Sequence, residues 1–338
     1  MRVFQGALIG CGFFSQHHQE AWRRIANVRI VAACDRRIDR ARAVAEHAYA
    51  SVEEMLNVEE LDFVDIVTRS ETHLELIARA AQRGLAISCQ KPMAPSWEDA
   101  CRMVEIAEAN RVRLMIHDNW RWQSWYRAAH TMITRGDIGV PLTYGFRCRW
   151  KDGGGDAPYP KQAYFRDVPR LIIDETLVHH IDTARFLFGS ISSVYAQARR
   201  VNPRIRAEDH AMLMLRHASE VMGSIDGHSF LAHEENSLGL DEAIFEGDSG
   251  SIRVCARGEI CAGNRKIWSD DFSRGYRGDS VYAALAHFIH CLETGMPFES
   301  EAREYLEKTF AVVEAAYASL AASRSVELAE IVRPLRIG

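Results

Sequence analysis

A glycine turn between two apolar segments near the start of the chain limits the fold more than any other feature. The first apolar segment leads to Gly10 and Gly12, a helical pattern covers residues 16–25, and a second apolar segment, residues 28–34, ends at Asp35. A strand, a glycine turn, a helix and a strand ending in an acid follow one another in a dinucleotide-binding unit. Gly10 permits the tight turn, and Gly12 lets the backbone approach a pyrophosphate. The sequence therefore predicts a dinucleotide site here; the alternative is a doubly wound fold whose first turn binds nothing.

The residues around this turn also indicate which dinucleotide binds. Ser15 stands where the pattern has its third glycine, and serine is small enough for close packing of the helix on the strand. Asp35 can accept hydrogen bonds from the adenosine ribose hydroxyls and would repel a 2′-phosphate, which favours NAD over NADP. Arg36 and Arg37 leave NADP open, because an arginine at this place could hold that phosphate.

The length of 338 residues is enough for two domains, and the composition excludes several classes of protein. Hydrophobic residues make up 47% and charged residues 26%, as in ordinary globular proteins. The formal net charge of −5 offers no basic face for nucleic acid, and the lack of a run of about 18 apolar residues argues against a membrane span. The N-terminus shows no signal-peptide pattern and the eight cysteines form no C-x-x-C pair, so we expect reduced thiols in a cytoplasmic protein.

Strand and helix patterns alternate as far as residue 118, which predicts a parallel sheet with helices on both faces. Gly84 is placed to end one helix, and Ser96 is placed to cap the next, with Asp99 at its third position. The strands predicted after residue 35 are 63–67, 86–90 and 113–116, and the helices are 73–83 and 96–110.

The pattern changes after residue 119, where strand-like runs follow one another without helices between them. Such an order predicts a largely antiparallel sheet. We therefore expect an α/β protein with a Rossmann-type, doubly wound parallel sheet in residues 1–120 and an α+β domain in residues 121–338, whose last helices can pack back on the first domain. The predicted strands are 143–150, 194–199, 211–215 and 243–245, and the predicted helices are 125–134, 175–188, 281–293 and 301–322.

Lys91 and Pro92 directly follow the predicted strand that ends at Gln90. In an open α/β sheet, ligands bind beyond the carboxyl ends of the strands, so a lysine here points toward the place of a nicotinamide. Pro92 fixes the backbone and could be cis, which would aim the side chain of Lys91. The alternative is a solvated surface lysine, the usual place of this residue type. Its location at a strand end favours a functional lysine.

Carboxylates and histidines gather in a predicted helix of the second domain. Glu175 and His179 are four residues apart and Asp182 is three further on, so an α-helix puts all three on one face, with His180 pointing away. Carboxylates beside an imidazole can orient and tune a general base. The alternatives are a core or surface histidine and, for Asp174, a helix N-cap. We predict no metal site, because no further spaced ligands accompany these residues.

Other residues near the predicted crevice are weaker candidates. Tryptophans just after a sheet strand could line a sugar pocket, and packing between domains is an equal alternative for them. A histidine at the start of a helix could cap the helix or contact the cofactor. The candidates for substrate contact are Asn119, Trp120, Arg121, Tyr164 and Arg166, and the candidate beside the cofactor is His73.

Together these elements resemble the glucose–fructose oxidoreductase, inositol dehydrogenase and MocA family over nearly the whole chain. The resemblance rests on Gly10-Cys11-Gly12-Phe13-Phe14, Asp35, Thr68 to His73, Gln90-Lys91-Pro92, Asn119-Trp120-Arg121, Glu175 with His179 and Asp182, and the segment 288–297. It implies that the first domain binds NAD or NADP and that the second shapes the substrate site and mediates homodimers or homotetramers. The implied cofactor contacts are Gly10, Gly12, Phe13, Phe14, Asp35, Arg36, Thr68, His73, Gln90 and Lys91.

Three positions depart from the pattern of this family. Gln90 replaces the usual glutamate before Lys91, which removes a negative charge beside the lysine ammonium. Glu175 stands four residues before His179, where the family has an aspartate, and the longer side chain leaves the role of Glu175 against Asp174 open. Arg69 stands where proline is common.

The resemblance implies an NAD-dependent dehydrogenase that oxidises a hydroxyl of a small-molecule sugar or polyol. His179 would accept the hydroxyl proton while Lys91 stabilises the developing alkoxide, and Glu175 and Asp182 would orient His179 or bind neighbouring hydroxyls. The favoured substrate is an aldose oxidised to its lactone, such as a small or branched pentose like apiose. Inositol or another polyol is the next alternative. The others are a lyase or glycosidase that retains NAD, and a non-catalytic dinucleotide sensor.

Overall fold

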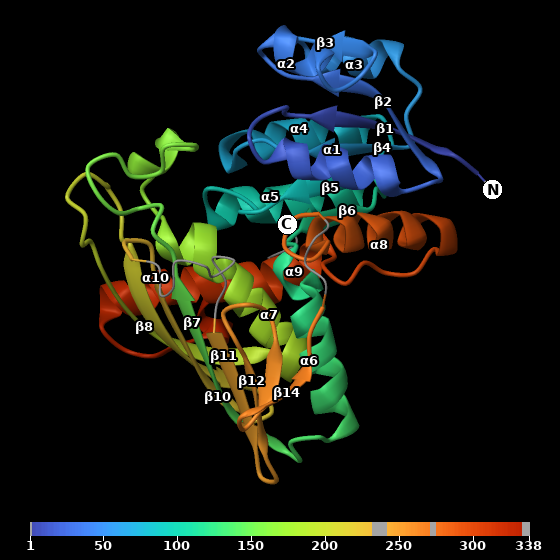
Figure 1. The fold of residues 1–338 in the computed structure, drawn as a ribbon. Helices are drawn as coiled ribbons and strands as arrows, with labels where there is room; N and C mark the ends of the chain where they lie inside the picture. The colour runs from blue at the N-terminus through green and yellow to red at the C-terminus, as the bar shows by residue number, and fades with distance from the viewer. Residues whose placement is uncertain (1, 232–241, 271–274, 333–338) are drawn as a thin grey trace. The chain divides into compact units, whose positions relative to one another are not determined.

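The computed structural model describes residues 2–231, 242–270 and 275–332, and contacts within the chain divide it into two compact units (Figure 1). The first unit comprises Met1–Trp122 and Ser273–Leu306, and the second comprises Gln123–Phe272 and Glu307–Gly338. Residues 273–306 thus belong to the first unit, whereas a division after residue 120 assigns them to the second. None of the helices in the described ranges is both long and apolar enough to cross a membrane.

The first unit alternates strands and helices, as the sequence predicts. Its strands are β1 (Phe4–Ile9), β2 (Val28–Cys34), β3 (His47–Tyr49), β4 (Phe63–Ile66), β5 (Ala86–Gln90) and β6 (Leu114–His117). Its α-helices are α1 (Ser15–Arg24), α2 (Ile38–Arg42), α3 (Val52–Val58), α4 (His73–Gln82), α5 (Trp97–Ala109), α8 (Ser280–Thr294) and α9 (Ala302–Tyr305), and short 3₁₀-helices cover Ser70–Thr72 and Trp120–Trp122.

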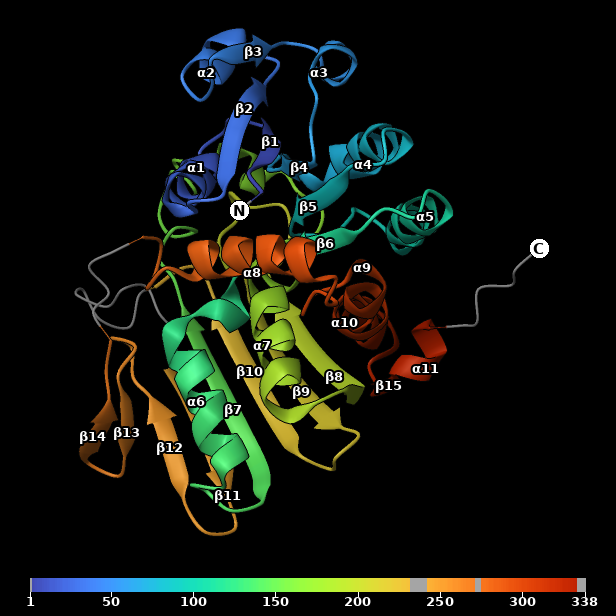
Figure 2. The same ribbon diagram turned by 90° about the vertical axis from the view of Figure 1, so that its right-hand side faces the viewer.

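The six strands of the first unit form a parallel sheet in the order β3-β2-β1-β4-β5-β6. Helix α1 lies on one face and helices α4 and α5 lie on the other, which explains why the strands are apolar (Figure 2). The rings of Trp22, Phe63 and Phe288 pack against one another in the core on the α1 side. The strand order reverses between β1 and β4, and ligands of such sheets bind at that point.

Local signals in the sequence set the ends of two helices as predicted. The Asp99 N–H donates to Ser96 Oγ at 3.1 Å and caps α5. Gly84 has a φ of +70° just beyond α4, a conformation that glycine adopts without steric cost. Both signals act within a few residues, so they can be read directly from the sequence.

The second unit is built on a larger sheet. Its strands are β7 (Pro141–Arg149), β8 (Ile191–Arg199), β9 (His210–His217), β10 (Met222–His228), β11 (Glu242–Gly247), β12 (Ser251–Val254), β13 (Ile260–Ala262), β14 (Arg265–Trp268) and β15 (Val326–Glu327). Its α-helices are α6 (Ser124–Arg135), α7 (Val178–Phe188), α10 (Ala311–Ala322) and α11 (Leu328–Ile331), and a 3₁₀-helix covers Ala163–Arg166.

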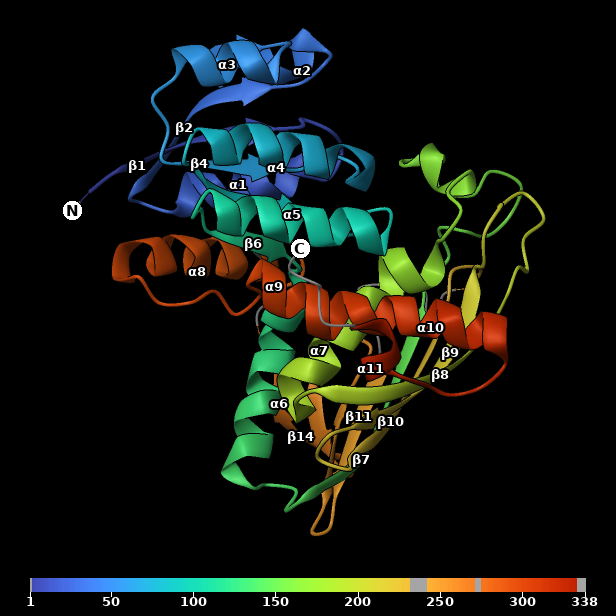
Figure 3. The same ribbon diagram turned by 180° about the vertical axis from the view of Figure 1, so that it is seen from behind.

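The nine strands follow the order β14-β13-β12-β11-β7-β10-β9-β8-β15. Every neighbouring pair is antiparallel except β7 with β10, which confirms the predicted, largely antiparallel sheet. Helices α6 and α7 lie against one face of the sheet (Figure 2), and α10 runs along β8 (Figure 3). Along β9 buried and exposed residues alternate, so one face of this strand is covered and the other is not.

Two predicted helices are interrupted by π-helical turns, so the prediction of single helices is wrong. The helix expected over 175–188 is a π-helical turn, Ile172–Leu177, followed by α7. The helix expected over 301–322 is broken at Leu306–Phe310 in the same way. A π-helical turn closes its hydrogen bonds over one more residue than an α-helix, and apolar periodicity does not reveal it. The α-helical spacing assumed for Glu175 and His179 therefore does not hold at Glu175.

Candidate active site

The two glycines of the first turn meet different surroundings. Gly10 has a φ of +92°, and a Cβ there would lie 2.5 Å from the carbonyl oxygen of Val67 and 2.7 Å from Thr68 Cγ2. Only glycine fits this position, because both the backbone conformation and the space exclude a side chain. A Cβ on Gly12, in contrast, would meet nothing within 4 Å. The backbone at Gly12 is therefore open to the close approach of a ligand.

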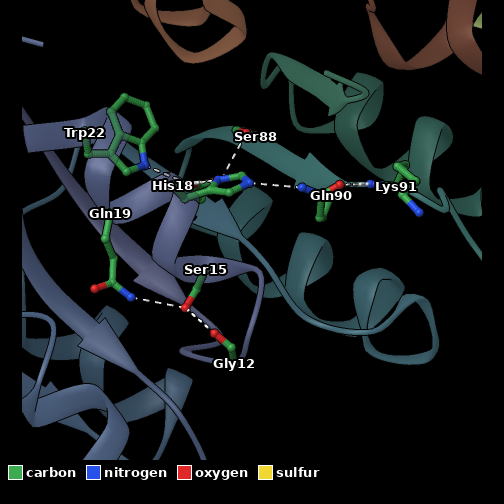
Figure 4. Close-up of polar contacts among 9 residues, drawn as sticks. Gly12, Ser15, His18, Gln19, Trp22, Ser88, Gln90 and Lys91 are labelled. Atoms are coloured by element: carbon green, nitrogen blue, oxygen red, sulfur yellow. Dashed lines mark hydrogen bonds and ion pairs between the residues drawn. The ribbon is translucent and has the colours of Figure 1, made fainter. Parts of the chain in front are cut away.

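The start of α1 offers the donors that a pyrophosphate needs. The Ser15 hydroxyl donates to the Gly12 carbonyl at 2.7 Å, and Gln19 Nε2 donates to Ser15 Oγ at 3.1 Å (Figure 4). In the described part of the chain no side chain caps this helix, and its first turn carries no acidic residue. Phe13 is exposed beside it, and Phe14 is partly buried against the core. Uncapped backbone N–H groups at a helix start bind anions, so the turn fits a dinucleotide phosphate.

Asp35 connects this turn to the end of β2. Its Oδ2 accepts the Cys11 N–H at 2.9 Å and its Oδ1 accepts the Arg37 N–H at 2.8 Å. A carboxylate oxygen can accept a second hydrogen bond, so the half-buried Asp35 remains able to hold ribose hydroxyls. Burial and the charge of Asp35 raise the pKa of the Cys11 thiol to about 12, which keeps that thiol neutral. Arg36 is exposed to solvent. The residues of the turn fit NAD.

His73 does not have the predicted place beside the cofactor. The side chain is fully buried, with Nδ1 at 3.1 Å from the Met93 carbonyl oxygen and Nε2 at 3.2 Å from the Thr68 carbonyl oxygen. Burial lowers the pKa of His73. Because both ring nitrogens face protein carbonyls, His73 connects two loops rather than contacting a ligand or capping α4. Thr68 is held near it by a hydrogen bond from the Thr72 hydroxyl, at 2.8 Å.

Lys91 stands immediately after β5, and the Lys91–Pro92 bond is cis. The Lys91 N–H donates to Gln90 Oε1 at 2.9 Å, and Gln90 Nε2 lies 3.0 Å from His18 Nε2 (Figure 4). Gln90 is buried and both ends of its amide contact protein groups. The predicted contact of the Gln90 side chain with the cofactor is therefore corrected. The side chain instead supports the backbone of Lys91.

The segment after β6 packs inside the first unit. Asn119 Nδ2 donates to Ser280 Oγ at 2.7 Å, and Arg121 Nη1 donates to the Glu299 carbonyl at 2.9 Å. All three residues from Asn119 to Arg121 are buried. Their contacts support the packing alternative, and substrate contact by this segment stays a prediction.

In the second unit, the two adjacent histidines of α7 differ in exposure. Every residue of α7 except His179 and Phe186 is buried, whereas His179 and Glu175 are partly exposed. His180 is fully buried, with its ring 5.6 Å from that of Phe146. Of the two histidines, His179 is therefore the one whose imidazole can reach a ligand, as the sequence predicts.

The two aspartates near His179 have structural surroundings. Asp182 is fully buried; its Oδ1 accepts the Thr309 hydroxyl at 3.0 Å and lies 3.6 Å from Arg185 Nη1. Asp174 is also buried, and it lies inside the π-helical turn rather than at an N-cap. Capping by Asp174 is corrected, because the helical segment begins before this residue. That Asp182 orients His179 or binds a neighbouring hydroxyl stays a prediction.

Residues that sequence reasoning missed hold the π-helical turn in place. Glu208 Oε1 accepts the Leu171 N–H at 3.1 Å, the Ile173 N–H at 3.4 Å and the Tyr317 hydroxyl at 2.6 Å. Burial and the nearby Glu208 raise the pKa of Tyr317 well above its ordinary value, which keeps it a donor. Glu208 follows Leu171 by 37 positions, so no local pattern could have revealed this contact.

The loop before this turn carries Tyr164 and Arg166, both partly exposed in the 3₁₀-helix. Gln162 Nε2 donates to the Tyr164 hydroxyl at 3.2 Å, and Arg166 Nε donates to the Pro158 carbonyl at 2.6 Å. These contacts order the loop. Substrate contact by the two side chains stays a prediction.

The parallel sheet with its reversed strand order, the glycine turn and the acid after β2 define a dinucleotide-binding domain of the Rossmann class. A family model described as "Oxidoreductase family, NAD-binding Rossmann fold" matches residues 4–117, and the model of the GFO/IDH/MocA C-terminal domain matches residues 126–253. The chain belongs to the GFO/IDH/MocA family, which confirms the resemblance found in the sequence.

Relatives and solved structures match nearly the whole chain. A D-apiose dehydrogenase of Paraburkholderia graminis is 36% identical, over 97% of this chain and 90% of its own length. A D-apiose dehydrogenase of Rhizobium rhizogenes is 33% identical, over 97% and 98% of the two chains. The crystal structure of an oxidoreductase from Agrobacterium radiobacter, in complex with NAD⁺, L-tartaric acid and magnesium, is 30% identical with a TM-score of 0.87, over 97% of this chain and 99% of that one.

Proposed function

We propose that the protein is an NAD-dependent dehydrogenase that oxidises D-apiose to its lactone. The observation that carries this proposal is the similarity to two D-apiose dehydrogenases along almost the full length of each chain. The glycine turn supports the cofactor half of the proposal, since Gly12 is open and α1 begins with uncapped N–H groups. Asp35 supports NAD rather than NADP, because its charge opposes a 2′-phosphate.

Lys91 and His179 are the residues that we propose to act on the substrate. The partly exposed imidazole of His179 accepts the proton of the reacting hydroxyl. The Lys91 ammonium donates a hydrogen bond to the same oxygen and stabilises its developing negative charge. When bound, NAD supplies the acceptor for the hydride that leaves the carbon. The carbon loses a hydride and the oxygen a proton, so a C=O bond is formed.

A panel of sugars and polyols tests the function directly. Purified protein is mixed with NAD or NADP and with D-apiose, other aldopentoses, hexoses or myo-inositol, and the absorbance of the reduced nicotinamide is followed. We expect the highest kcat/KM with NAD and D-apiose. A higher kcat/KM with myo-inositol would replace the aldose by a polyol. No reduction with any compound, in a protein that still binds NAD, would replace the dehydrogenase by a lyase that retains NAD or by a sensor.

We further propose that the cytoplasmic enzyme is a homodimer or homotetramer built on the open face of the second sheet. Four apolar side chains are exposed there: Met212 and Met214 of β9, Met222 of β10 and Ile244 of β11. Met212 pairs with Asp226 and Met214 with Ser224 across β9 and β10, so the side chains point to one face of the sheet. An exposed apolar patch on one sheet face is typical of a protein interface, and a second copy of this chain is its proposed occupant.

A further inference from the structure

A chain of buried hydrogen bonds leads from the interior of the first unit to the backbone of Lys91. His18 Nδ1 lies 2.7 Å from Asp65 Oδ2. On the other side of the ring, His18 Nε2 lies 3.0 Å from Gln90 Nε2, and the Lys91 N–H donates to Gln90 Oε1 at 2.9 Å (Figure 4). His18 and Asp65 are completely buried and Gln90 is 5% exposed. We call the side chains of His18, Asp65 and Gln90 the relay. It connects α1, β4 and β5 at the point where Lys91 leaves the sheet.

The positions of the protons in the relay follow from the partners. The Lys91 N–H can only donate, so the oxygen of the Gln90 amide faces it and the NH₂ group faces His18. His18 Nε2 must then be an acceptor without a proton, and its Nδ1–H donates to Asp65. His18 is therefore a neutral imidazole with its single proton on Nδ1.

Asp65 is the ionised end of the relay. Its Oδ2 also accepts the Trp22 Nε1–H at 2.7 Å, and its Oδ1 accepts the Ser88 hydroxyl at 3.1 Å. Burial alone would raise the pKa of Asp65, but the hydrogen bonds that His18 and Trp22 donate to it hold the pKa below its ordinary value. Three donors around one buried carboxylate also fix its orientation, so the relay begins at a rigid point.

We propose that Gln90 is a positioning residue for Lys91, and that its neutral amide selects the Nδ1–H form of His18 while it holds the Lys91 backbone. This inference rests on the proposed function, in which Lys91 contacts the reacting oxygen. A glutamate at position 90 would face His18 Nε2 with an acceptor. Two acceptors cannot share a hydrogen bond without a proton, so the relay would take up one extra proton, held between the introduced carboxylate and His18.

The other groups that face His18 do not change the placement of its proton by Gln90 and Asp65. The ring of His117, from β6, lies 4.5 Å from that of His18, and the ring of Phe14 lies 5.7 Å away. His17 precedes it on α1, and burial lowers the pKa of His17 to about 4. The thiol of Cys89, beside Asp65, has a pKa raised well above its ordinary value by burial. Asp65 is thus the carboxylate that directly contacts His18, and Gln90 sets the proton count at the opposite ring nitrogen.

The proton count can be measured without any substrate. In ¹⁵N spectra of the histidine rings, with the His18 signals identified by their loss in His18→Gln, we expect the ring proton of His18 on Nδ1 and a bare Nε2. In Gln90→Glu we expect a proton that bridges the new carboxylate and His18 and is released as the pH rises. A wild-type His18 with a proton on Nε2, alone or together with one on Nδ1, would overturn the proposal even if the enzyme oxidises D-apiose.

Kinetics then test whether the relay acts through Lys91. We expect Gln90→Leu, which removes both hydrogen bonds, to lower kcat about tenfold, equal to 1.36 kcal/mol, with the Kd of NAD nearly unchanged. We expect Gln90→Glu to keep activity at low pH and to lose it as the pH rises and the extra proton leaves. Gln82→Glu adds the same charge at an exposed site of α4 and serves as the matched control.

The outcomes separate this inference from the proposed function. If the wild-type protein oxidises none of the sugars, the proposed function fails, while the ¹⁵N spectra still decide the proton count of the relay. If it oxidises D-apiose and both Gln90 variants share its kcat and pH profile, Gln90 does not position Lys91. If Gln90→Leu loses activity only because it folds less well, its Kd for NAD and its unfolding transition will change as well. That outcome would also count against positioning.

Discussion

Asp35 and Lys91 each follow directly after a strand of the parallel sheet, so the strands determine where their backbones lie. The side chain of Asp35 is held by the backbone N–H groups of Cys11 and Arg37. For Lys91 it is the backbone that is held, by the amide of Gln90. Substitution of each side chain therefore tests its chemistry without removing the strand that places it.

We expect Lys91→Ala to lower kcat for D-apiose oxidation by about 100-fold or more, because a donor to the developing oxyanion is lost. The N–H of residue 91 remains and still bonds to Gln90, so the Kd of NAD should change little. Steady-state kinetics and titration with NAD measure the two effects. Lys266→Ala, at an exposed site of β14, is the control, and a near-normal kcat in Lys91→Ala would remove this residue from the proposed mechanism.

We expect Asp35→Asn to reduce the preference for NAD over NADP by about tenfold, because the amide no longer repels a 2′-phosphate. The amide oxygen can still accept one of the two backbone N–H groups, so the turn is retained. The ratio of kcat/KM for the two cofactors measures the preference. Asp39→Asn removes a charge from an exposed site on α2 and should leave the ratio unchanged. An unaltered ratio in Asp35→Asn would show that another residue selects the cofactor.

At the level of secondary-structure elements, the π-helical turn before α7 depends on a residue from another part of the chain. Glu208 Oε1 accepts two backbone N–H groups at the start of this turn together with the Tyr317 hydroxyl. A helix start without such an acceptor leaves buried donors unpaired. The turn that carries Glu175 is therefore stabilised through Glu208.

We expect Glu208→Ala to lower the free energy of unfolding by about 2–4 kcal/mol, because three donors lose their acceptor at a partly buried site. Urea unfolding followed by circular dichroism measures this change. Glu208→Gln keeps one acceptor oxygen and should lose less. An Ala variant as stable as the wild-type protein would mean that water replaces the carboxylate at this turn.

A buried histidine makes the second sheet sensitive to acid. His217 Nε2 lies 2.8 Å from the Tyr144 hydroxyl and its Nδ1 lies 2.9 Å from the Gly189 carbonyl oxygen, so a neutral ring accepts from Tyr144 and donates to Gly189. Burial lowers the pKa of His217 from 6.5 to about 4. The unfolded chain therefore binds a proton at a higher pH than the folded protein does.

The stabilising effect of a neutral His217 is complete above pH 6.5 and is lost as the pH falls toward 4. The shift corresponds to about 3 kcal/mol at most. We expect the free energy of unfolding of His217→Asn, although lower at pH 7, to fall less steeply between these pH values than that of the wild-type protein. Urea unfolding at each pH measures the slopes. Parallel curves would assign the acid sensitivity to other histidines.

For the whole molecule, the architecture could be predicted because its signals are local. The glycine turn, the cap at Ser96 and the alternation of strand and helix patterns each act over a few residues, and the structure contains the predicted parallel sheet. The antiparallel order of the second sheet follows in the same way from strands without intervening helices.

The parts that could not be predicted depend on residues far apart in the sequence. His18 is 47 positions from Asp65 and 72 positions from Gln90, so nothing near Lys91 indicates the relay. The π-helical turn is missed because its apolar pattern matches that of an α-helix. The interior place of Asp182 depends on Thr309 of a later segment, and a helix face alone does not show which side is covered.

The oligomeric state tests the use of the open sheet face. Met214 is 64% exposed near the middle of that face, paired with Tyr195 on one side and Ser224 on the other. A carboxylate at this position would have to lose its water in an interface, which is costly without a partner charge. We therefore expect the wild-type protein to sediment as a dimer or tetramer and Met214→Glu as a smaller species with an unchanged unfolding transition. Met296→Glu, at an exposed site outside this sheet, should sediment like the wild-type protein. A monomeric wild-type protein, or an unchanged assembly in Met214→Glu, would show that this face does not join the subunits.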